Sequence, residues 1–276
     1  MTPPIIQILG LPFLACVLMS TILGYLGIHV LKREVIFIDI ALAQIAAVGS
    51  IVAHLAFEAH GDSPMAYGCS VGLVLLAAGF YAFVRSRVRQ ISLEAIIGIS
   101  YAVAAAAALF LVGIAPGGHV HIQHILSGSL LWTSRWQVIV SLLVYSGAGF
   151  CLYFMRTPFT EISNDYQSTA QKSTSVVIYD FVFYSLLGVV ITLAVQTGGV
   201  VVVFAYLIIP ATISAIFSSR LGVRLAIVWV TAAAGSLGGL LFAYFLDFSI
   251  GPAIAAFLGL QLIVASLAAR LRRTAL

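Results

Sequence analysis

Nine apolar runs, each close to the length of a helix that crosses a bilayer, follow one another along almost the whole chain. They lie at 5–30, 36–57, 65–84, 95–115, 136–155, 176–195, 200–217, 225–246 and 252–269. A helix needs about 20 apolar residues to cross a hydrocarbon core of about 30 Å. No polar stretch between the runs is long enough for a soluble domain. The runs therefore predict an all-α polytopic membrane protein with about eight or nine transmembrane helices, forming a single transmembrane domain over residues 1–276.

Composition excludes the soluble classes of protein. Only 8% of the residues are charged and 62% are hydrophobic, whereas soluble domains carry about 25% charged residues. The three cysteines, Cys16, Cys69 and Cys151, lie far apart and show neither a zinc-site spacing nor a CxxC pair. The net charge of +4 follows from membrane topology, so we expect no nucleic-acid partner.

Basic residues fall almost entirely on one side of the predicted membrane. With nine spans, twelve of the thirteen Lys and Arg residues lie on one side and Arg135 lies on the other. Cytoplasmic loops carry an excess of Lys and Arg, so we expect the N-terminus outside and the C-terminus in the cytoplasm. Residues 1–10 carry no basic residue and so lack the start of a cleaved signal peptide.

The run at 200–217 contains a proline, Pro210, in a stretch of eighteen residues without charge. A proline inside a helix removes one hydrogen bond and favours a kink. In lipid the freed carbonyl needs another partner, and Thr212 and Ser214 are close enough to help. We therefore expect this helix to be buried among other helices. The kink serves either packing alone or the movement of the helix.

Two pairs of glycines have the GxxxG spacing that lets helices approach closely. They are Gly68 with Gly72, and Gly235 with Gly239. We expect both pairs to lie at helix–helix contacts.

Histidines gather on the predicted outer face. His119, His121 and His124 are the densest group, and His60 lies beside Asp62 in another outer loop. Imidazole is a common ligand of zinc and other transition metals. The spacings of two and three residues in the densest group bring the rings within reach of one metal ion only if the loop folds suitably, and the alternative is a solvated group of surface histidines.

Three acids touch the predicted spans, and ionisable residues there are candidates for function. Asp39 and Asp180 lie near inner ends and Asp247 lies at an outer end. Gln44 and His54 are polar positions on the same run as Asp39, but the three do not share one helix face. Asp39, Gln44 and His54 can form a metal site only together with side chains from other helices, and Asp247 is a candidate metal ligand on the outer side. The alternative for each of the three acids is a merely interfacial position.

The chain shows no nucleotide-binding or catalytic pattern. Lys172 and Ser173 have no glycine-rich loop before them, and no HExxH or Ser/His/Asp arrangement is apparent. We therefore expect no catalytic residue and no cofactor, and no hydrolysis of ATP by this chain alone. The polar inner loop at 156–175 is expected to contain a short helix capped by Ser163, Asn164 or Asp165. A second short element, interfacial or re-entrant, is predicted at 126–134.

Three stretches together resemble the membrane permease subunit of ATP-binding-cassette importers for zinc, manganese and iron. They are 37–49 (FIDIALAQIAAVG), 162–170 (ISNDYQSTA) followed by 198–215 with LIIPAT inside it, and 247–252 (DFSIGP). The family has an aromatic residue, Gly-Asp and His-Ala in the first stretch. In the second it has a Ser-Pro-Asp-type loop before Leu-Ile-Ile-Pro-Ala-Ala, and in the third Asp-x-Pro-x-Gly-Pro. Order and spacing agree over nearly the whole chain.

The first and third stretches also depart from the family pattern. With Gly49 on the family glycine, the family aspartate falls on Ile40 and the family histidine on Gln44, so that Asp39 stands one place off. A family proline falls on Ser249. These differences affect the metal-coordinating positions and therefore the choice of metal.

The resemblance implies an importer-type permease fold in a bacterial-type inner (plasma) membrane. Two permease chains, as a homodimer or with a close relative, would form the pathway for a divalent metal ion as substrate. Two cytoplasmic ATPase subunits would bind ATP and dock on the loop at 156–175. An extracytoplasmic metal-binding protein would deliver the ion. The ATPase-coupling residues would be Glu161, Ser163, Asn164 and Asp165.

Several functions remain open at this point. Zinc is favoured as the ion because histidines outnumber acids on the outer face, with manganese or iron next. The alternatives are a permease for a metal chelate or a cobalamin-like ligand, and a stand-alone secondary metal carrier or channel. A carrier needs ion-coupling groups near the midplane, where the chain offers only Gln44. A purely structural membrane scaffold is the last alternative.

Overall fold

The computed structural model describes residues 5–57, 63–88, 90–114, 130–164 and 176–274, and all of their regular structure is helical. Nine of the described helices are long and apolar enough to cross a membrane. They are α1 (Ile5–Lys32), α2 (Ile38–Phe57), α3 (Pro64–Arg87), α4 (Leu93–Ile114), α6 (Arg135–Phe154), α9 (Val176–Gly198), α10 (Val200–Phe217), α11 (Leu221–Leu246) and α12 (Ile250–Thr274). The predicted all-α class and the nine spans are thus confirmed.

Two shorter helices complete the described structure. The 3-10 helix η1 (Leu130–Trp132) lies in the segment predicted as an interfacial or re-entrant element, and α7 (Arg156–Asn164) lies in the predicted inner loop. That loop therefore contains a short helix, but it ends where the predicted N-cap residues stand. Asn164 ends α7, so a helix capped by 163–165 would lie in 165–175, outside the described residues.

Local sequence explains several helix boundaries. Ser63 precedes Pro64, the first residue of α3, and its Oγ accepts a hydrogen bond from the amide of Ala66 at 3.2 Å. Ser is a favoured N-cap, and proline suits the first helical position because its missing N–H needs no partner there. Gly199 separates α9 from α10 with a φ of 79°, a conformation that costs glycine little.

The chain divides into two compact units, each assembled from separate stretches. The first unit comprises 1–31, 127–147 and 196–276, and thus most of α1, η1, the first part of α6 and α10–α12. The second comprises 32–126 and 148–195, and thus α2–α4, α7 and most of α9. That the chain acts as one transmembrane domain stays a prediction.

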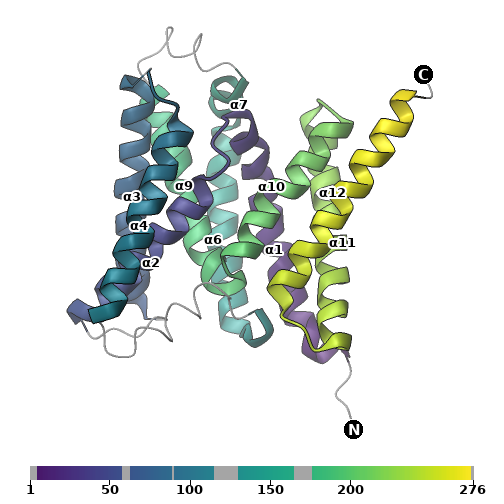
Figure 1. The fold of residues 1–276 in the computed structure, drawn as a ribbon, viewed down its shortest axis with the longest axis horizontal. Helices are drawn as coiled ribbons and strands as arrows, with labels where there is room; N and C mark the ends of the chain where they lie inside the picture. Colours follow the sequence, from purple (N-terminus) through teal and green to yellow (C-terminus); the bar gives the residue numbers. More distant parts are fainter. Residues whose placement is uncertain (1–4, 58–62, 89, 115–129, 165–175, 275–276) are drawn as a thin grey trace. The chain divides into compact units, whose positions relative to one another are not determined.

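In the second unit, α2 packs against both α3 and α4 (Figure 1). A Cβ atom on Gly49 of α2 would lie 2.5 Å from the Cα of Ser70 of α3, so only glycine allows this approach. Ser70 Oγ donates a hydrogen bond to the carbonyl of Ala46 at 2.8 Å. Gly188 similarly brings α9 against Val74 of α3. Small residues thus allow both α2 and α9 to approach α3 closely.

In the first unit, α10, α11 and α12 pack against one another (Figure 1). A Cβ on Gly239 would lie 2.6 Å from the Cα of Ile254, and one on Gly235 would lie 2.5 Å from a side-chain carbon of Leu258. The predicted role of this GxxxG pair is confirmed. For Gly68 and Gly72 the described chain shows no such contact, because a Cβ built at either would have no atom within 4 Å beyond the adjacent part of its own helix. The role of this pair stays a prediction.

Pro210 lies inside α10 and is buried, as are Tyr206, Leu207, Ala211 and Ser214 around it. This confirms a helix surrounded by other parts of the protein. The hydroxyl groups of Thr212 and Ser214 do not bond the carbonyl that the proline leaves free. Thr212 Oγ1 donates to the carbonyl of Ile208 at 2.8 Å, and Ser214 Oγ donates to the carbonyl of Ala211 at 2.6 Å. The carbonyl four residues before Pro210 belongs to Tyr206 and receives neither bond. The kink stays a prediction.

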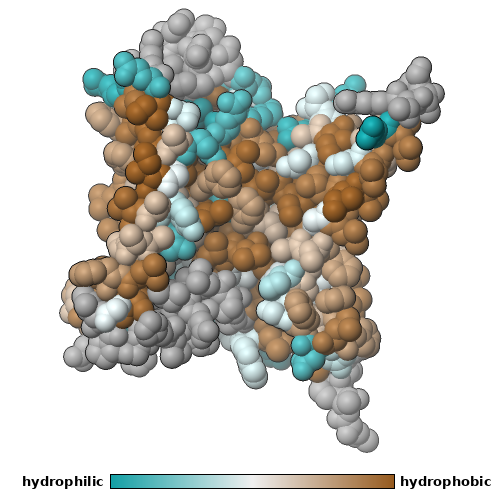
Figure 2. Space-filling view, in the orientation of Figure 1, coloured by the Kyte–Doolittle hydropathy of each residue, from teal (hydrophilic) through white to brown (hydrophobic). Residues whose placement is uncertain are grey.

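Large apolar side chains cover the outward faces of the spanning helices. Figure 2 shows hydrophobic residues over most of the visible surface of the helices, with hydrophilic residues mainly near their ends. The most exposed apolar side chains include Leu76, Phe110, Leu143, Val230 and Phe245. In water such a surface would aggregate, whereas in a bilayer it contacts lipid.

Candidate functional site

Asp39 is a buried acid in the first turn of α2. It is 1% exposed, and neither carboxylate oxygen has a hydrogen-bond partner among the described residues. Burying an unpaired carboxylate is costly, so buried acids in membrane proteins are normally paired or bind ions. Asp39 is therefore the strongest candidate cation ligand among the predicted residues that the structure describes.

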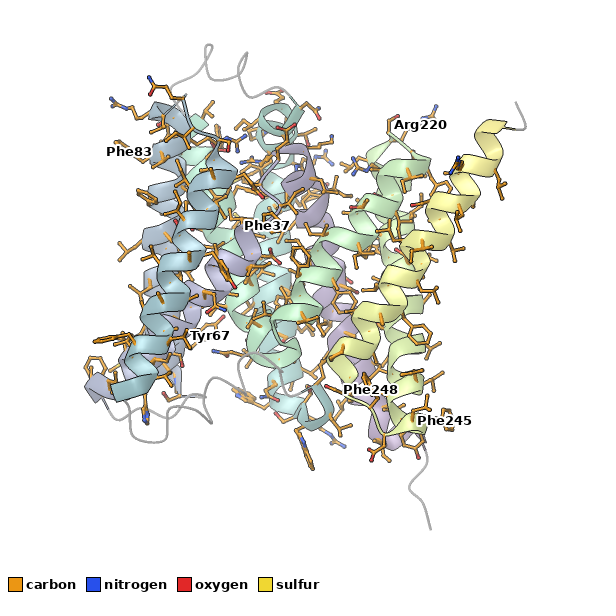
Figure 3. All side chains as sticks on the ribbon, in the orientation of Figure 1. Phe37, Tyr67, Phe83, Arg220, Phe245 and Phe248 are labelled. Carbon is orange, nitrogen blue, oxygen red and sulfur yellow. The ribbon has the colours of Figure 1, made fainter. Side chains whose placement is uncertain are left out.

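A second acid, Glu94 in the first turn of α4, lies beside the start of α2. Its Oε1 accepts a hydrogen bond from the amide of Phe37 at 3.1 Å, and its Oε2 is buried without a hydrogen-bond partner in the described part of the chain. Figure 3 marks Phe37, which directly precedes α2. Asp39 and Glu94 are close enough for their negative charges to repel each other. Two carboxylates with spare oxygens at neighbouring helix starts suit a divalent cation.

Glu94 is not among the site residues predicted from the sequence, because it directly precedes the apolar run predicted at 95–115. The only local signal was an acid in the first turn of a spanning helix. Such an acid is also favoured there by the helix dipole, so the signal does not distinguish a ligand from a helix-stabilising residue.

The other candidate ligands on α2 do not join Asp39. Gln44 and His54 are half-buried, and they follow Asp39 by about 7 Å and 22 Å along a helix that rises 1.5 Å per residue. Within the described ranges, no group of three or more His, Cys, Asp or Glu residues is placed to hold a metal ion.

The predicted outer ligands are described only in part. Asp247 ends α11 in a left-handed conformation with a φ of 50°, and its side chain is exposed. The four loop histidines lie outside the described residues, as does the coupling candidate Asp165. These histidines are His60, His119, His121 and His124.

The coupling candidates on α7 differ in exposure. Glu161 and Asn164 are exposed, whereas Ser163 is buried together with Phe159 and Ile162. An amphipathic helix of this kind buries its apolar face and presents its polar face to solvent or to a partner. Glu161 and Asn164 thus lie on the exposed face of α7, while Ser163 lies on its buried face.

Asp180 of α9 lies in a cluster with two arginines, which we call the Arg–Asp–Arg cluster (Arg33, Asp180 and Arg85). Arg33 Nη1 lies 2.6 Å from Asp180 Oδ1, and both side chains are fully buried. Arg85 Nε lies 3.8 Å from Asp180 Oδ2. This differs from the merely interfacial position considered for Asp180. In the sequence, Arg33 and Arg85 are visible only as topology signals, because their partner is distant along the chain.

Comparison with known proteins places the chain in a family. The profile of the ABC 3 transport family matches residues 6–269. The chain belongs to the ABC 3 transport family. This confirms the family resemblance inferred from the three sequence stretches.

Two relatives of this ABC 3 family member carry metal-transport names. The "Manganese transport system membrane protein MntC" of Halalkalibacterium halodurans is 25% identical over 240 residues, which cover 87% of this chain and 80% of the relative. A "Probable metal transport system membrane protein" of Chlamydia pneumoniae is 25% identical over 255 residues, which cover 90% and 84%.

Two solved structures share the fold of this ABC 3 family member. One is PsaBC from Streptococcus pneumoniae in complex with Fab, with a TM-score of 0.78, 18% identity, and coverage of 96% of this chain and 91% of that chain. The other is described as an inward-facing conformation of a metal-chelate type ABC transporter, with a TM-score of 0.73, 15% identity, and coverage of 97% and 90%. The predicted importer-type permease fold is thereby confirmed, and the multi-pass membrane architecture with it.

Proposed function

We propose that this chain is the membrane permease subunit of an ATP-driven importer for a divalent transition-metal ion. The family match supports a transport role, and the names of two relatives support a metal ion as the substrate. The observation that carries the proposal in this chain is the buried, unpaired carboxylate of Asp39 next to Glu94.

In this proposal Asp39 and Glu94 contact the ion on its way through the second unit. Their oxygens would replace part of the hydration shell of the ion, as carboxylates do in protein cation sites. Gln44 and His54 would offer further polar contacts along α2. His60, His119, His121, His124 and Asp247 would receive the ion on the outer face.

The choice of metal is part of the proposal. The outer histidines favour zinc, whereas the two carboxylates of the described site favour manganese, because carboxylates suit manganese better than imidazole does. One relative is named for manganese. We therefore propose manganese and zinc as the two ions to test first, followed by iron.

The partners follow from the same proposal. Two ATPase subunits dock on the loop at 156–175 and contact the exposed Glu161 and Asn164 of α7. A second permease chain, as a homodimer or with a close relative, completes the pathway, and an extracytoplasmic binding protein delivers the ion. The N-terminus lies outside and the C-terminus in the cytoplasm, in accord with the distribution of basic residues.

The test is metal-stimulated ATPase activity of the chain co-purified with a candidate ATPase subunit in lipid nanodiscs. The binding protein is added loaded with manganese, zinc or iron in turn, and the metal-free binding protein is the control. Stimulation by one loaded form supports an ATP-driven importer and identifies its ion.

Two other outcomes would favour other functions. Stimulation only by a metal chelate would favour the chelate-type permease, whose fold is also similar. Passage of metal down a gradient in liposomes, by a chain that purifies without any ATPase subunit, would overturn the proposal in favour of a carrier or channel.

A further inference from the structure

We infer that the Arg–Asp–Arg cluster fastens α7 to the spanning helices, so that α7 and the N-terminal part of α9 move as one body. Asp180 is then a positioning residue that connects the ATPase-docking helix to the membrane part. The consequence for transport rests on the proposed function, whereas the attachment itself does not.

Arg33 connects α7 to α9 directly. Its Nε donates a hydrogen bond to Ser163 Oγ of α7 at 3.1 Å, while its Nη1 pairs with Asp180 Oδ1 of α9 at 2.6 Å. Ser163 Oγ in turn donates to the carbonyl of Phe159 at 2.6 Å. One fully buried guanidinium group thus bridges the two helices, and its planar fork fixes the direction of both bonds.

A second polar contact lies beside the first. Lys32, the last residue of α1, donates from Nζ to Asn164 Oδ1 at 2.7 Å. The last two residues of α7 are therefore both held by consecutive basic residues, Lys32 at the end of α1 and Arg33 directly after it.

Aromatic packing completes the attachment. The ring centres of Phe159 on α7 and Phe183 on α9 are 5.7 Å apart in an edge-to-face arrangement, and both residues are fully buried. The guanidinium carbon of Arg33 lies 4.0 Å from the centre of the Phe183 ring, within the range of a cation–π contact. Apolar packing alone would let α7 slide, and the directional bonds of Arg33 oppose that.

Arg85 extends the cluster to α3. It shares Asp180 with Arg33, and its Nη1 donates to the hydroxyl of Tyr184 at 2.6 Å. Asp180 is thus the anion common to both ion pairs. Without it, the fully buried Arg33 and the partly buried Arg85 would lose their shared anion, and leaving a buried charge uncompensated is strongly unfavourable. We therefore expect α7 to lose its fixed position when Asp180 is neutralised.

The attachment is tested by pulsed EPR on the permease assembled with its ATPase subunits in nanodiscs. Spin labels are placed at Thr157→Cys on α7 and Ile178→Cys on α9, both exposed, after Cys16, Cys69 and Cys151 are replaced by Ala. We expect one narrow distance distribution that is the same without nucleotide and with a non-hydrolysable ATP analogue. A distribution that shifts with the analogue would overturn the inference.

Substitutions then test the role of the cluster itself. Asp180→Asn should broaden the label–label distribution. Ser163→Ala, which deletes only a hydroxyl, should broaden the label–label distribution less. If Asp180→Asn does not fold, the distribution of Ser163→Ala shows whether the cluster holds α7. The matched control is Arg224→Gln, which removes another buried arginine that bonds Ser214 on α10 instead. Unchanged distributions in both cluster variants would overturn the inference.

A functional readout separates positioning from mere stability. In proteoliposomes, we expect Asp180→Asn to lower the number of manganese or zinc ions moved per ATP by about fivefold or more, while the ATPase subunits stay bound. An unchanged ratio would refute the role in transport. If the chain binds no ATPase subunit, the proposed function fails, and the label distances in the permease alone still decide whether the cluster holds α7.

Discussion

The surroundings of Asp39 in the fold say more about its role than its position in the helix does. Its first-turn position on α2 would suit any helix-stabilising acid. The absence of hydrogen-bond partners on either oxygen within the described chain, at 1% exposure, does not fit that simple role. The proposed contact of this carboxylate with a passing cation would account for both observations.

We expect Asp39→Asn to lower metal uptake about tenfold, because a contact with a charged group contributes about 1.5–3 kcal/mol. The side chain keeps its size, so the amount of protein in the membrane should not change. Uptake of radioactive manganese or zinc into proteoliposomes measures the effect. Glu34→Gln, which removes an exposed acid five residues earlier, is the control, and wild-type uptake by Asp39→Asn would contradict the assignment.

The outer histidines can be tested together at the same scale. Replacing His119, His121 and His124 by Ala should raise the metal concentration needed for half-maximal uptake about tenfold and leave the maximal rate unchanged, because weaker binding alone affects KM. Uptake measured over a range of metal concentrations separates the two constants. An unchanged KM would show that these histidines do not bind the transported ion.

Close helix packing is the property that matters at the scale of elements. Gly49 has Ser70 of α3 in the place where a side chain would go, whereas Gly72 on α3 has free space in the described chain. The GxxxG spacing did not indicate the contact of Gly49 with α3, because such a spacing says nothing about which helix face meets a neighbour.

Gly49→Ala should therefore lower the free energy of unfolding by about 1–3 kcal/mol, the usual cost of overpacking. Gly72→Ala should be neutral or stabilise by up to about 1 kcal/mol, since alanine has the better helix propensity. Thermal unfolding in detergent compares the two variants. Equal midpoints would show that α2 and α3 do not approach as described.

The whole molecule carries its charge asymmetrically along the predicted membrane normal, and this leads to a test of orientation. Ser249→Cys, between α11 and α12, should react with a membrane-impermeant maleimide added to intact cells. Glu161→Cys on α7 should react only after the membrane is opened, because the positive-inside rule places α7 in the cytoplasm. The reverse pattern of labelling would contradict the proposed topology.

Hydropathy and motif order were sufficient for the architecture and the family. The nine spans are visible in the sequence because each span depends only on its own apolar length, and the largest error in a predicted end is at α12, where the helix continues through basic residues to Thr274. The three short stretches led to the ABC 3 transport family because their order along the chain is itself informative.

Partners across the fold were decided only by the tertiary structure. Arg33 and Asp180 are 147 positions apart in the sequence, and no local pattern pairs them. The same holds for Glu94 beside Phe37 and for Gly49 against Ser70. Hydropathy reports whether a residue leaves water, which is a local property. Which side chain it meets there depends on the register and rotation of neighbouring helices, and these arise only when the helices pack.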